Sequence, residues 1–375
     1  MKPMDTEPSS LLLQVQDWLL RRIPASGVRR VLPVLAALGS DVGIVRKENQ
    51  DRVALARGRD HLGHTYVVAA LADGIGGMRD GAECAALAVS AVIDSIHRLA
   101  SSGAPLSQWA TDATENAHEA VRRMYGGTGG ATLVLLLITE KEGAYWTSVG
   151  DSRLYVSKGG TLLQVSTDDT IAGQLGREAG SDLDRGKLLQ YIGMEGPLEL
   201  EVSKLSFTSV DTAILTTDGI HFLSTDSEVM SLVVRHSPEI GATARRLTEL
   251  ARWSGGPDNA TVAIVSLDTS LYEPLPTYAC LDIWDPFGEI RVPLIHREDQ
   301  QLVGSRVTSA RPQAAKHETA TADTATATVT QSAGKDEGAP SKTKSGKGKP
   351  RKRKPRTPRG GSAPQVQLEF SDKKI

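Results

Sequence analysis

The chain has 375 residues, enough for one large domain or two ordinary ones, and its apolar fraction of 39% is low for a wholly globular chain. Its two cysteines, Cys84 and Cys280, lie far apart in sequence, which excludes a disulfide framework and a thiolate zinc site. No run reaches the roughly 18 apolar residues that span a bilayer. Because the N-terminus also lacks an apolar signal segment, we expect a cytoplasmic protein without a transmembrane segment.

The overall charge of −2 hides an asymmetry along the chain. Ten basic residues and no acid lie between Ser341 and Gly360. Removing this +10 from the overall charge leaves the rest of the chain at −12. An acidic body is typical of a cation-binding enzyme, although many ordinary solvated surfaces are acidic too.

Residues 1–37 form an N-terminal extension with one helical pattern. Apolar residues recur at helical spacing from Leu11 to Leu20, and Arg21, Arg22 and Pro24 follow them. The pattern predicts a short amphipathic helix that docks on the body of the protein or on a partner. A helix lying on a membrane surface is the alternative.

Residues 38–268 have the pattern of one folded domain. Apolar and β-branched runs predict strands at 52–56, 66–71, 131–139, 144–149, 153–157, 161–165, 201–207, 213–217 and 260–265. Helical spacing predicts helices at 82–99, 107–124, 227–236 and 240–253. Strands in runs and helices in pairs favour an α+β domain, with antiparallel sheets whose outer faces the helices cover.

Two further segments follow the domain. Residues 269–308 contain scattered prolines and aromatics and form an extension that the sequence does not place. Residues 309–375 are Thr/Ala-rich and then basic, so we expect a disordered C-terminal tail that buries too little to offset its ordering entropy. The sequence leaves open whether this tail binds nucleic acid, anionic lipid or an acidic partner, or only tethers and solubilises.

Acidic residues stand at the ends of several predicted strands. Each on its own is consistent with a plain turn, but together they suggest one shared site for a hard cation. The residues are Asp51, Asp73, Asp218 and Asp258. After Asp73 come Gly74, Gly76 and Gly77, which permit positive φ and close approach of a ligand to the main chain.

Six short motifs around these acids resemble those of a known family. They are residues 41–51, 73–77, 129–132, 149–153, 217–219 and 258–261. In this order they resemble type 2C protein serine/threonine phosphatases, the metal-dependent PPM family, over about residues 38–268. The resemblance implies a four-layer sandwich of two antiparallel sheets flanked by helix pairs, and it implies hydrolysis of phosphoserine and phosphothreonine by a metal-activated water.

The resemblance also implies a role for each site residue. Asp73 is expected to bridge two divalent cations, and the Gly74 carbonyl to bind one of them. Asp218 and Asp258 are expected to complete the first metal, while Asp51 helps to hold the second. Further roles are implied for Asp151, as ligand of a third, weaker metal, and for Arg46, as the residue that grips the substrate phosphate. Carboxylates, carbonyls and waters suit Mg²⁺ or Mn²⁺ rather than zinc.

The chain departs from the family pattern at two positions. Gln50 stands where many members carry Glu, so a water contact to the metal there is neutral. Ile75 replaces the His of other members, so no side-chain acid is expected at that position and a metal-bound water is the expected proton donor.

Other residues are assigned ordinary structural roles. Asp168 and Asp169 are interpreted as solvated loop residues, and Trp146 and Trp253 as core residues. Residues 167–199 are expected to form a flap beside the site.

The predicted activity opposes a Ser/Thr kinase and acts on a phosphorylated protein. The main alternative is a phosphoprotein-binding pseudophosphatase or signalling scaffold, whose basic tail recruits an acidic partner. A nucleic-acid-binding module with an incidental phosphatase fold is a third reading.

Overall fold

The computed structural model describes residues 8–78, 80–158, 161–174, 187–206, 211–221, 227–237, 239–275 and 280–293. The expected disordered tail, 309–375, lies outside the described residues, as do residues 294–308 of the segment before it. All described residues belong to one compact unit, residues 1–310.

Two antiparallel sheets form the centre of the domain. Sheet A has six strands, in the spatial order β1 (Ser26–Val31), β2 (Ala36–Asp41), β11 (Ala260–Ser266), β10 (Thr212–Thr216), β7 (Arg153–Lys158) and β8 (Thr161–Gln164). Sheet B has seven, in the order β13 (Gly288–Pro293), β12 (Cys280–Asp285), β3 (Arg52–Arg59), β4 (Thr65–Ala72), β5 (Leu133–Thr139), β6 (Gly143–Val149) and β9 (Ser203–Leu205). The inner faces of the two sheets bury a common apolar layer.

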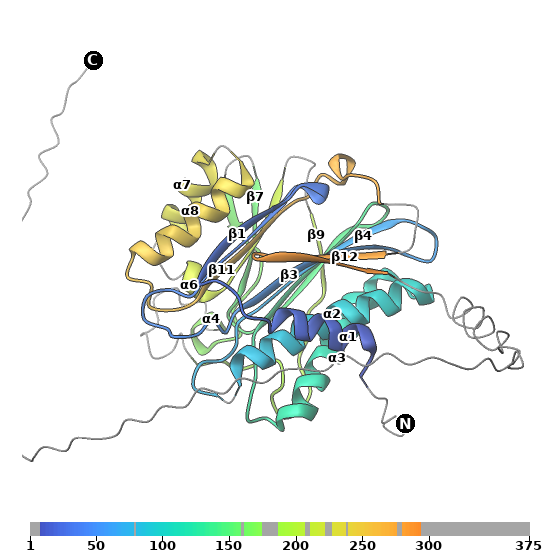
Figure 1. The fold of residues 1–375 in the computed structure, drawn as a ribbon, viewed down its shortest axis with the longest axis horizontal. Coiled ribbons are helices and arrows are strands. Elements are labelled where there is room, and N and C mark those ends of the chain that lie inside the picture. The colour runs from blue at the N-terminus through green and yellow to red at the C-terminus, as the bar shows by residue number, and fades with distance from the viewer. Residues whose placement is uncertain are drawn as a thin grey trace, which may run out of the picture. The chain divides into compact units, whose positions relative to one another are not determined.

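Helices cover the outer faces of both sheets. Beside sheet B lie α1 (Ser10–Leu19), α2 (Gly81–Ser102) and α3 (Leu106–Tyr125), and beside sheet A lie α7 (Ser227–His236) and α8 (Ile240–Trp253), as Figure 1 shows. Two one-turn helices, α4 (Ile171–Gln174) and α6 (Asp218–His221), and two 3₁₀ turns, Leu32–Val34 and Thr269–Leu271, complete the described elements. The predicted α+β fold of two antiparallel sheets flanked by helices is confirmed.

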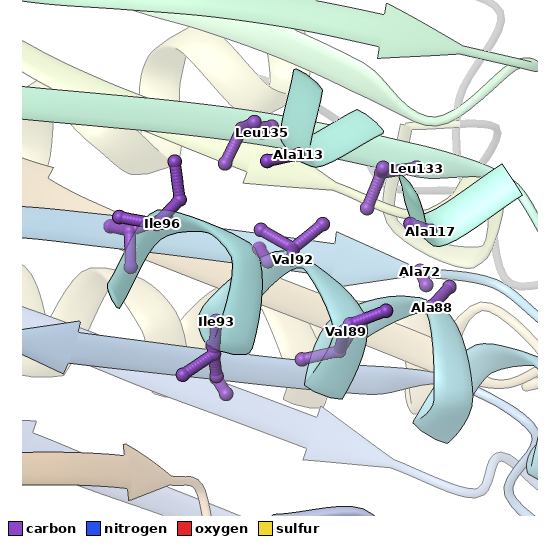
Figure 2. Close-up of a cluster of buried hydrophobic side chains, with 14 of the residues drawn as sticks. Ala72, Ala88, Val89, Val92, Ile93, Ile96, Ala113, Ala117, Leu133 and Leu135 are labelled. Carbon is purple, nitrogen blue, oxygen red and sulfur yellow. The ribbon is translucent and has the colours of Figure 1, made fainter. Parts of the chain in front are cut away.

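The core under α2 explains why this helix is apolar nearly all round. Alanines such as Ala88 let α2 approach sheet B closely, while Val92 and Ile96 fill the space toward Leu135 and the neighbouring helix (Figure 2). By length and composition alone α2 would also span a membrane, but most of its apolar stretch is buried inside the protein. It is therefore the core helix of this layer.

Each helix and strand expected between residues 52 and 265 has a counterpart, with bounds that differ by a few residues. Sheet A begins earlier than the domain limit expected at residue 38, because β1 pairs with β2 along its whole length. Sheet B continues later than residue 268, because β12 pairs with β3 and β13 with β12. The expected N-terminal helix is present as α1, and it packs on α2.

The interpretation of Trp253 as a core residue is wrong. Trp253 is 82% exposed and is the last residue of α8. The buried face of α8 runs through Ala244, Leu247 and Ala251, and a residue two positions beyond Ala251 points away from that face. Trp146 is partly buried and packs against the layer between the sheets.

Candidate metal and phosphate site

The candidate site lies where strands of both sheets begin or end. Asp51 immediately precedes β3 and Asp73 immediately follows β4, and the pairing of Arg52 with Ala72 places these two acids side by side. In sheet A, β10 ends just before Asp218, beside the start of β11, which Asp258 precedes. The acids far apart in sequence therefore meet at one end of the sandwich.

A hydrogen bond joins the two halves of this site. Thr217 Oγ1 donates to Asp51 Oδ2 at 3.0 Å, and Thr261 N donates to the same hydroxyl at 3.0 Å. Thr217 follows β10 of sheet A, whereas Asp51 leads into β3 of sheet B. The hydroxyl thus fixes one carboxylate across the gap between the sheets.

The carboxylates of the site repel one another. Burial, and after it the charges of Asp51 and Asp218, raise the pKa of Asp73 well above its usual range. Burial, and then the charge of Asp151, raise the pKa of Asp218 in the same way. Buried like charges are stable only when they are protonated or balanced by a cation.

The donor set fits a divalent cation. Asp51 Oδ1 and Asp218 Oδ1 are both buried without a hydrogen-bond partner, in a structure where most buried polar atoms are paired. All the donors are oxygens, which hard cations such as Mg²⁺ and Mn²⁺ prefer. No three acidic, histidine or cysteine side chains among the described residues enclose an ion by themselves. Backbone carbonyls and waters would complete the coordination, as is usual for Mg²⁺.

The loop after Asp73 is held by its main chain. Asp73 N donates to Thr132 Oγ1 at 3.0 Å, and Thr132 N donates back to the Asp73 carbonyl at 2.8 Å. A Cβ on Gly74 would lie 2.3 Å from the Gly81 carbonyl oxygen, so no side chain fits there. Of the three glycines predicted to permit positive φ, only Gly77 has it, at +89°. Gly74 is required for space.

Gln50 takes part in the site through its backbone. Its N–H donates to Asn259 Oδ1 at 2.8 Å, and its carbonyl accepts from Gly74 N at 3.2 Å. Its side-chain amide lies against the start of α2, where a Cβ on Gly81 would be 3.1 Å away. The residue that departs from the family pattern therefore links the turn before β3 to the loop after β4.

Arg46 and Asp258 form the exposed edge of the site. Arg46 Nη2 donates to Asp258 Oδ2 at 2.7 Å, and the two side chains are 41% and 30% exposed. That hydrogen bond raises the pKa of Arg46, which stays a cation. A Cβ on Gly76 would lie 2.9 Å from Arg46 Nη1, so Gly76 leaves room for the guanidinium beside the Asp73 loop.

Asp151 lies in the turn between β6 and β7. It is buried, and burial together with the charge of Asp168 raises its pKa to about 6. The structure contradicts the interpretation of Asp168 and Asp169 as solvated loop residues. Asp168 accepts two hydrogen bonds from Arg153, at 2.7 and 2.8 Å, because the segment after β8 folds back onto β7.

Asp169 is built into the same turn. Gly150 N donates to its carboxylate at 3.0 Å, and Asp169 N donates to the Gly150 carbonyl at 2.8 Å. Asp169 therefore ties the start of the expected flap to the turn that carries Asp151.

Sequence reasoning missed the residues that hold the acids in place. Thr217, Thr132 and Asn259 were seen only as parts of motifs. Asn259 Nδ2 donates to the carbonyls of Val42 and Glu48, both at 2.9 Å, and so closes the loop that carries Arg46. The available signal was a threonine or asparagine adjacent to two of the strand-end acids, Thr217 before Asp218 and Asn259 after Asp258.

Comparison with known proteins agrees with this geometry. Residues 45–255 match the family model described as protein phosphatase 2C. The match covers more than half of the chain, so the chain belongs to the protein phosphatase 2C family. It is a metal-dependent protein serine/threonine phosphatase.

Individual relatives are moderately similar. The chain is 28% identical over 252 residues to protein phosphatase PhpP of Streptococcus pneumoniae, a match that covers 62% of this chain and 97% of PhpP. The crystal structure of the Mycobacterium tuberculosis phosphatase PstP/Ppp has 27% identity and a TM-score of 0.52, covering 64% of this chain and 99% of that one. A second structure, the PstP catalytic domain in complex with two manganese ions, has 26% identity and a TM-score of 0.50, covering 64% and 98%.

Proposed function

We propose that the chain hydrolyses phosphoserine and phosphothreonine in proteins at a centre of two divalent cations, Mn²⁺ or Mg²⁺. Asp73 would serve both ions, and the Gly74 carbonyl would bind one of them. Asp218 and Asp258 would hold the first ion, while Asp51 would help to hold the second. The observation that carries the proposal is the meeting of strand-end carboxylates with two buried, unpartnered oxygens. The two manganese ions bound by the PstP domain support the number.

Arg46 is the proposed phosphate-binding residue. Its planar guanidinium offers two parallel donors to phosphoryl oxygens, a geometry that lysine lacks. The side chain is exposed, and it would exchange its hydrogen bond to Asp258 for the substrate. When bound, two divalent cations would supply charge that favours in-line displacement at phosphorus and would lower the pKa of the attacking water.

The proposal assigns no histidine as general acid. Ile75 carries no titratable proton, and burial holds the pKa of His221 well below its usual range. His221 Nδ1 is also hydrogen-bonded to the Thr216 hydroxyl at 2.9 Å. This bond ties the ring on α6 to the end of β10. A pH-rate profile whose acidic limb disappears in His221→Gln would contradict this assignment.

We also propose a third, weaker cation site at Asp151, shared with Asp218. The charge of Asp151 is the strongest of the neighbouring charges that raise the pKa of Asp218, which supports a shared ion. The catalytic domain proposed from the sequence, 38–268, holds every one of these residues. A cognate Ser/Thr kinase would supply the phosphoprotein that this site consumes.

The test is hydrolysis of p-nitrophenyl phosphate and of a phosphothreonine peptide by the full chain. We expect turnover of both with Mn²⁺ or Mg²⁺ and none in the presence of a chelator. Calorimetric titration with Mn²⁺ should give two sites of similar strength and a weaker third that is lost in Asp151→Asn. Folded, metal-saturated protein that turns over neither substrate would overturn the proposal and favour the pseudophosphatase alternative.

A further inference from the structure

Helix α1 and the hairpin of β12 and β13 lie outside the family match, yet they are bound to each other. Arg21 donates two hydrogen bonds to Asp285 at the end of β12, at 2.7 and 2.9 Å. The same guanidinium lies 4.2 Å from the ring centroid of Trp18, and it donates to the Trp18 carbonyl at 2.7 Å. The Asp285 carboxyl is nearly buried, which makes this pair stronger than an exposed one.

Helix α1 is fixed on α2 by its own sequence. Ser9 caps the helix by accepting from Leu12 N at 3.0 Å, and its hydroxyl also donates to Asp94 Oδ1 on α2. Val15 and Leu19 are buried against the core of sheet B and α2. The last turn of α1 therefore reaches the start of β3 in a fixed position.

Arg52, the first residue of β3, closes this last turn. Its Nε donates to the Leu19 carbonyl at 2.9 Å, one of the carbonyls that a helix C-terminus leaves without an intrahelical partner. A cation at this end also stabilises the helix dipole. The residue is only 9% exposed, so the guanidinium is built into the interior.

The other side of the same guanidinium holds the candidate metal site. Arg52 Nη1 donates to the carbonyls of Asn49 and Asp51, at 2.8 and 2.7 Å. These two carbonyls bracket the turn that delivers the Asp51 carboxylate. One side chain thus contacts the N-terminal helix and the backbone of a proposed metal ligand.

We propose that Arg52 is a positioning residue that couples the docking of helix α1 to the metal affinity of the site. This inference rests on the proposed function and extends that function to helix α1, which lies outside the family match. With Arg52 in place, the turn at Asn49 is fixed and Asp51 presents its free oxygen beside Asp73. Without it, the turn loses both carbonyl contacts and the Asp51 carboxylate loses its fixed direction.

The chain offers a matched control in Arg57. It lies on the same strand, is 3% exposed, and also donates to a backbone carbonyl, that of Glu273, at 2.8 Å. It pairs with Asp282 of β12 at 3.1 Å, away from the site. Arg52→Gln and Arg57→Gln each remove one buried guanidinium from β3, but only the first touches the turn before Asp51.

The experiment measures Mn²⁺ binding to the full chain by calorimetry, with thermal unfolding as the measure of folding. We expect the Mn²⁺ dissociation constant to rise about tenfold in Arg52→Gln, the range typical of lost outer contacts to metal ligands. In Arg57→Gln it should stay within about twofold of wild type, although both variants unfold at lower temperature. At saturating Mn²⁺, kcat of Arg52→Gln should return close to that of wild type.

Two outcomes overturn the inference: wild-type Mn²⁺ affinity in folded Arg52→Gln, or equal weakening in both variants. If Arg52→Gln does not fold, Arg52→Lys takes its place, because an ammonium keeps the charge but cannot reach all three carbonyls in fixed directions. Arg52→Lys should bind Mn²⁺ more weakly than wild type, and unchanged affinity would again overturn the inference. Wild-type protein that binds no Mn²⁺ would instead contradict the proposed function.

Discussion

The connection between β2 and β3 has two halves that differ sharply. Residues 44–48, the exposed half, are all solvent-exposed and include Arg46. Residues 49–51 form the buried half, in which Asn49 and Asp51 are buried and Gln50 between them is partly buried. Asn49 Nδ2 donates to Ser40 Oγ at 2.8 Å, and Asp51 accepts from Thr217 through Oδ2, while Asp51 Oδ1 has no hydrogen-bond partner.

The two halves are built for different tasks. Hydrogen bonds from the interior hold the buried half, and they fix the direction of the Asp51 carboxylate before any ligand arrives. Arg46 in the exposed half forms an ion pair with Asp258, which is itself partly exposed. Metal binding benefits from the first arrangement, whereas a residue that exchanges partners with a substrate needs the second.

The largest expected effect comes from Asp73→Asn, which removes the proposed bridge between the ions. Activity with Mn²⁺ should fall by about a thousandfold or more, because several kcal/mol of charge stabilisation are lost. Steady-state hydrolysis of a phosphothreonine peptide measures it. Asp60→Asn, at the opposite end of the same hairpin, is the control and should keep wild-type turnover.

The same variant should stabilise the metal-free protein. Because burial and neighbouring acids raise the pKa of Asp73 above its unfolded value of about 3.9, the folded state holds a proton that the unfolded state releases. The stability of chelated wild type should therefore fall as pH rises from about 4 through the raised pKa. In Asp73→Asn this slope should be smaller, and an equally steep fall in unfolding temperature would contradict the repulsion described above.

Arg46→Ala tests the exposed half. Losing charged hydrogen bonds of about 1.5–3 kcal/mol should lower kcat/KM by about ten- to a hundredfold. Because Arg46 is not a metal ligand, the Mn²⁺ dissociation constant should not rise. Lys47→Ala, its exposed neighbour, is the control. Weaker Mn²⁺ binding in Arg46→Ala would show that the two halves are not separate in function.

Thr217→Val tests the buried half with a smaller change. Valine keeps the shape of threonine but removes the hydroxyl that donates to Asp51 Oδ2. The Mn²⁺ affinity should fall about tenfold, with kcat largely restored at saturating Mn²⁺. Thr212→Val, at the other end of β10, should leave the affinity unchanged. Calorimetric titration of the two variants makes the comparison.

The sequence predicts those features of the fold and the site that depend on local patterns. Strand-end acids such as Asp73 and Asp218 are visible because periodicity places the strands, and the apolar spacing of α2 and α8 sets their buried faces. Thr217 and Asp51 are 166 residues apart, and no periodic signal links a hydroxyl to a carboxylate at that distance. Likewise, no sequence pattern around Arg52 indicates that its side chain contacts the end of helix α1.

The extension after residue 268 shows the same limit. Its prolines weaken any strand pattern, and β12 becomes a strand because the edge of β3 is available to it. For Trp253 the reason is different: its hydrophobicity predicts burial, but its position on α8 lies off the face that Ala244, Leu247 and Ala251 bury. Local patterns thus identify elements and ligands, while the contacts that orient the ligands depend on tertiary packing.

The smallest expected effect concerns His118, whose ring is hydrogen-bonded to residues 193–196, the segment next to the Asp73 loop. Gly193 N donates to His118 Nδ1 at 3.2 Å, and Nε2 lies 3.0 Å from the Gly196 carbonyl, so the neutral ring serves both. The same segment pairs with Ala131 through Ile192, and the neighbouring Gly130 carbonyl accepts from Ile75 N.

Burial lowers the pKa of His118 below its unfolded value of about 6.5, so the unfolded chain binds the extra proton more readily. The stability of this segment should fall by about 1 kcal/mol as pH drops from about 6.5 toward the lowered pKa, because a protonated Nδ1 no longer accepts from Gly193. Hydrogen exchange at the Gly193 amide, corrected for intrinsic rates, should show that loss of protection in wild type. His118→Gln cannot titrate, and a loss of protection of the same size in that variant would rule out the histidine as its cause.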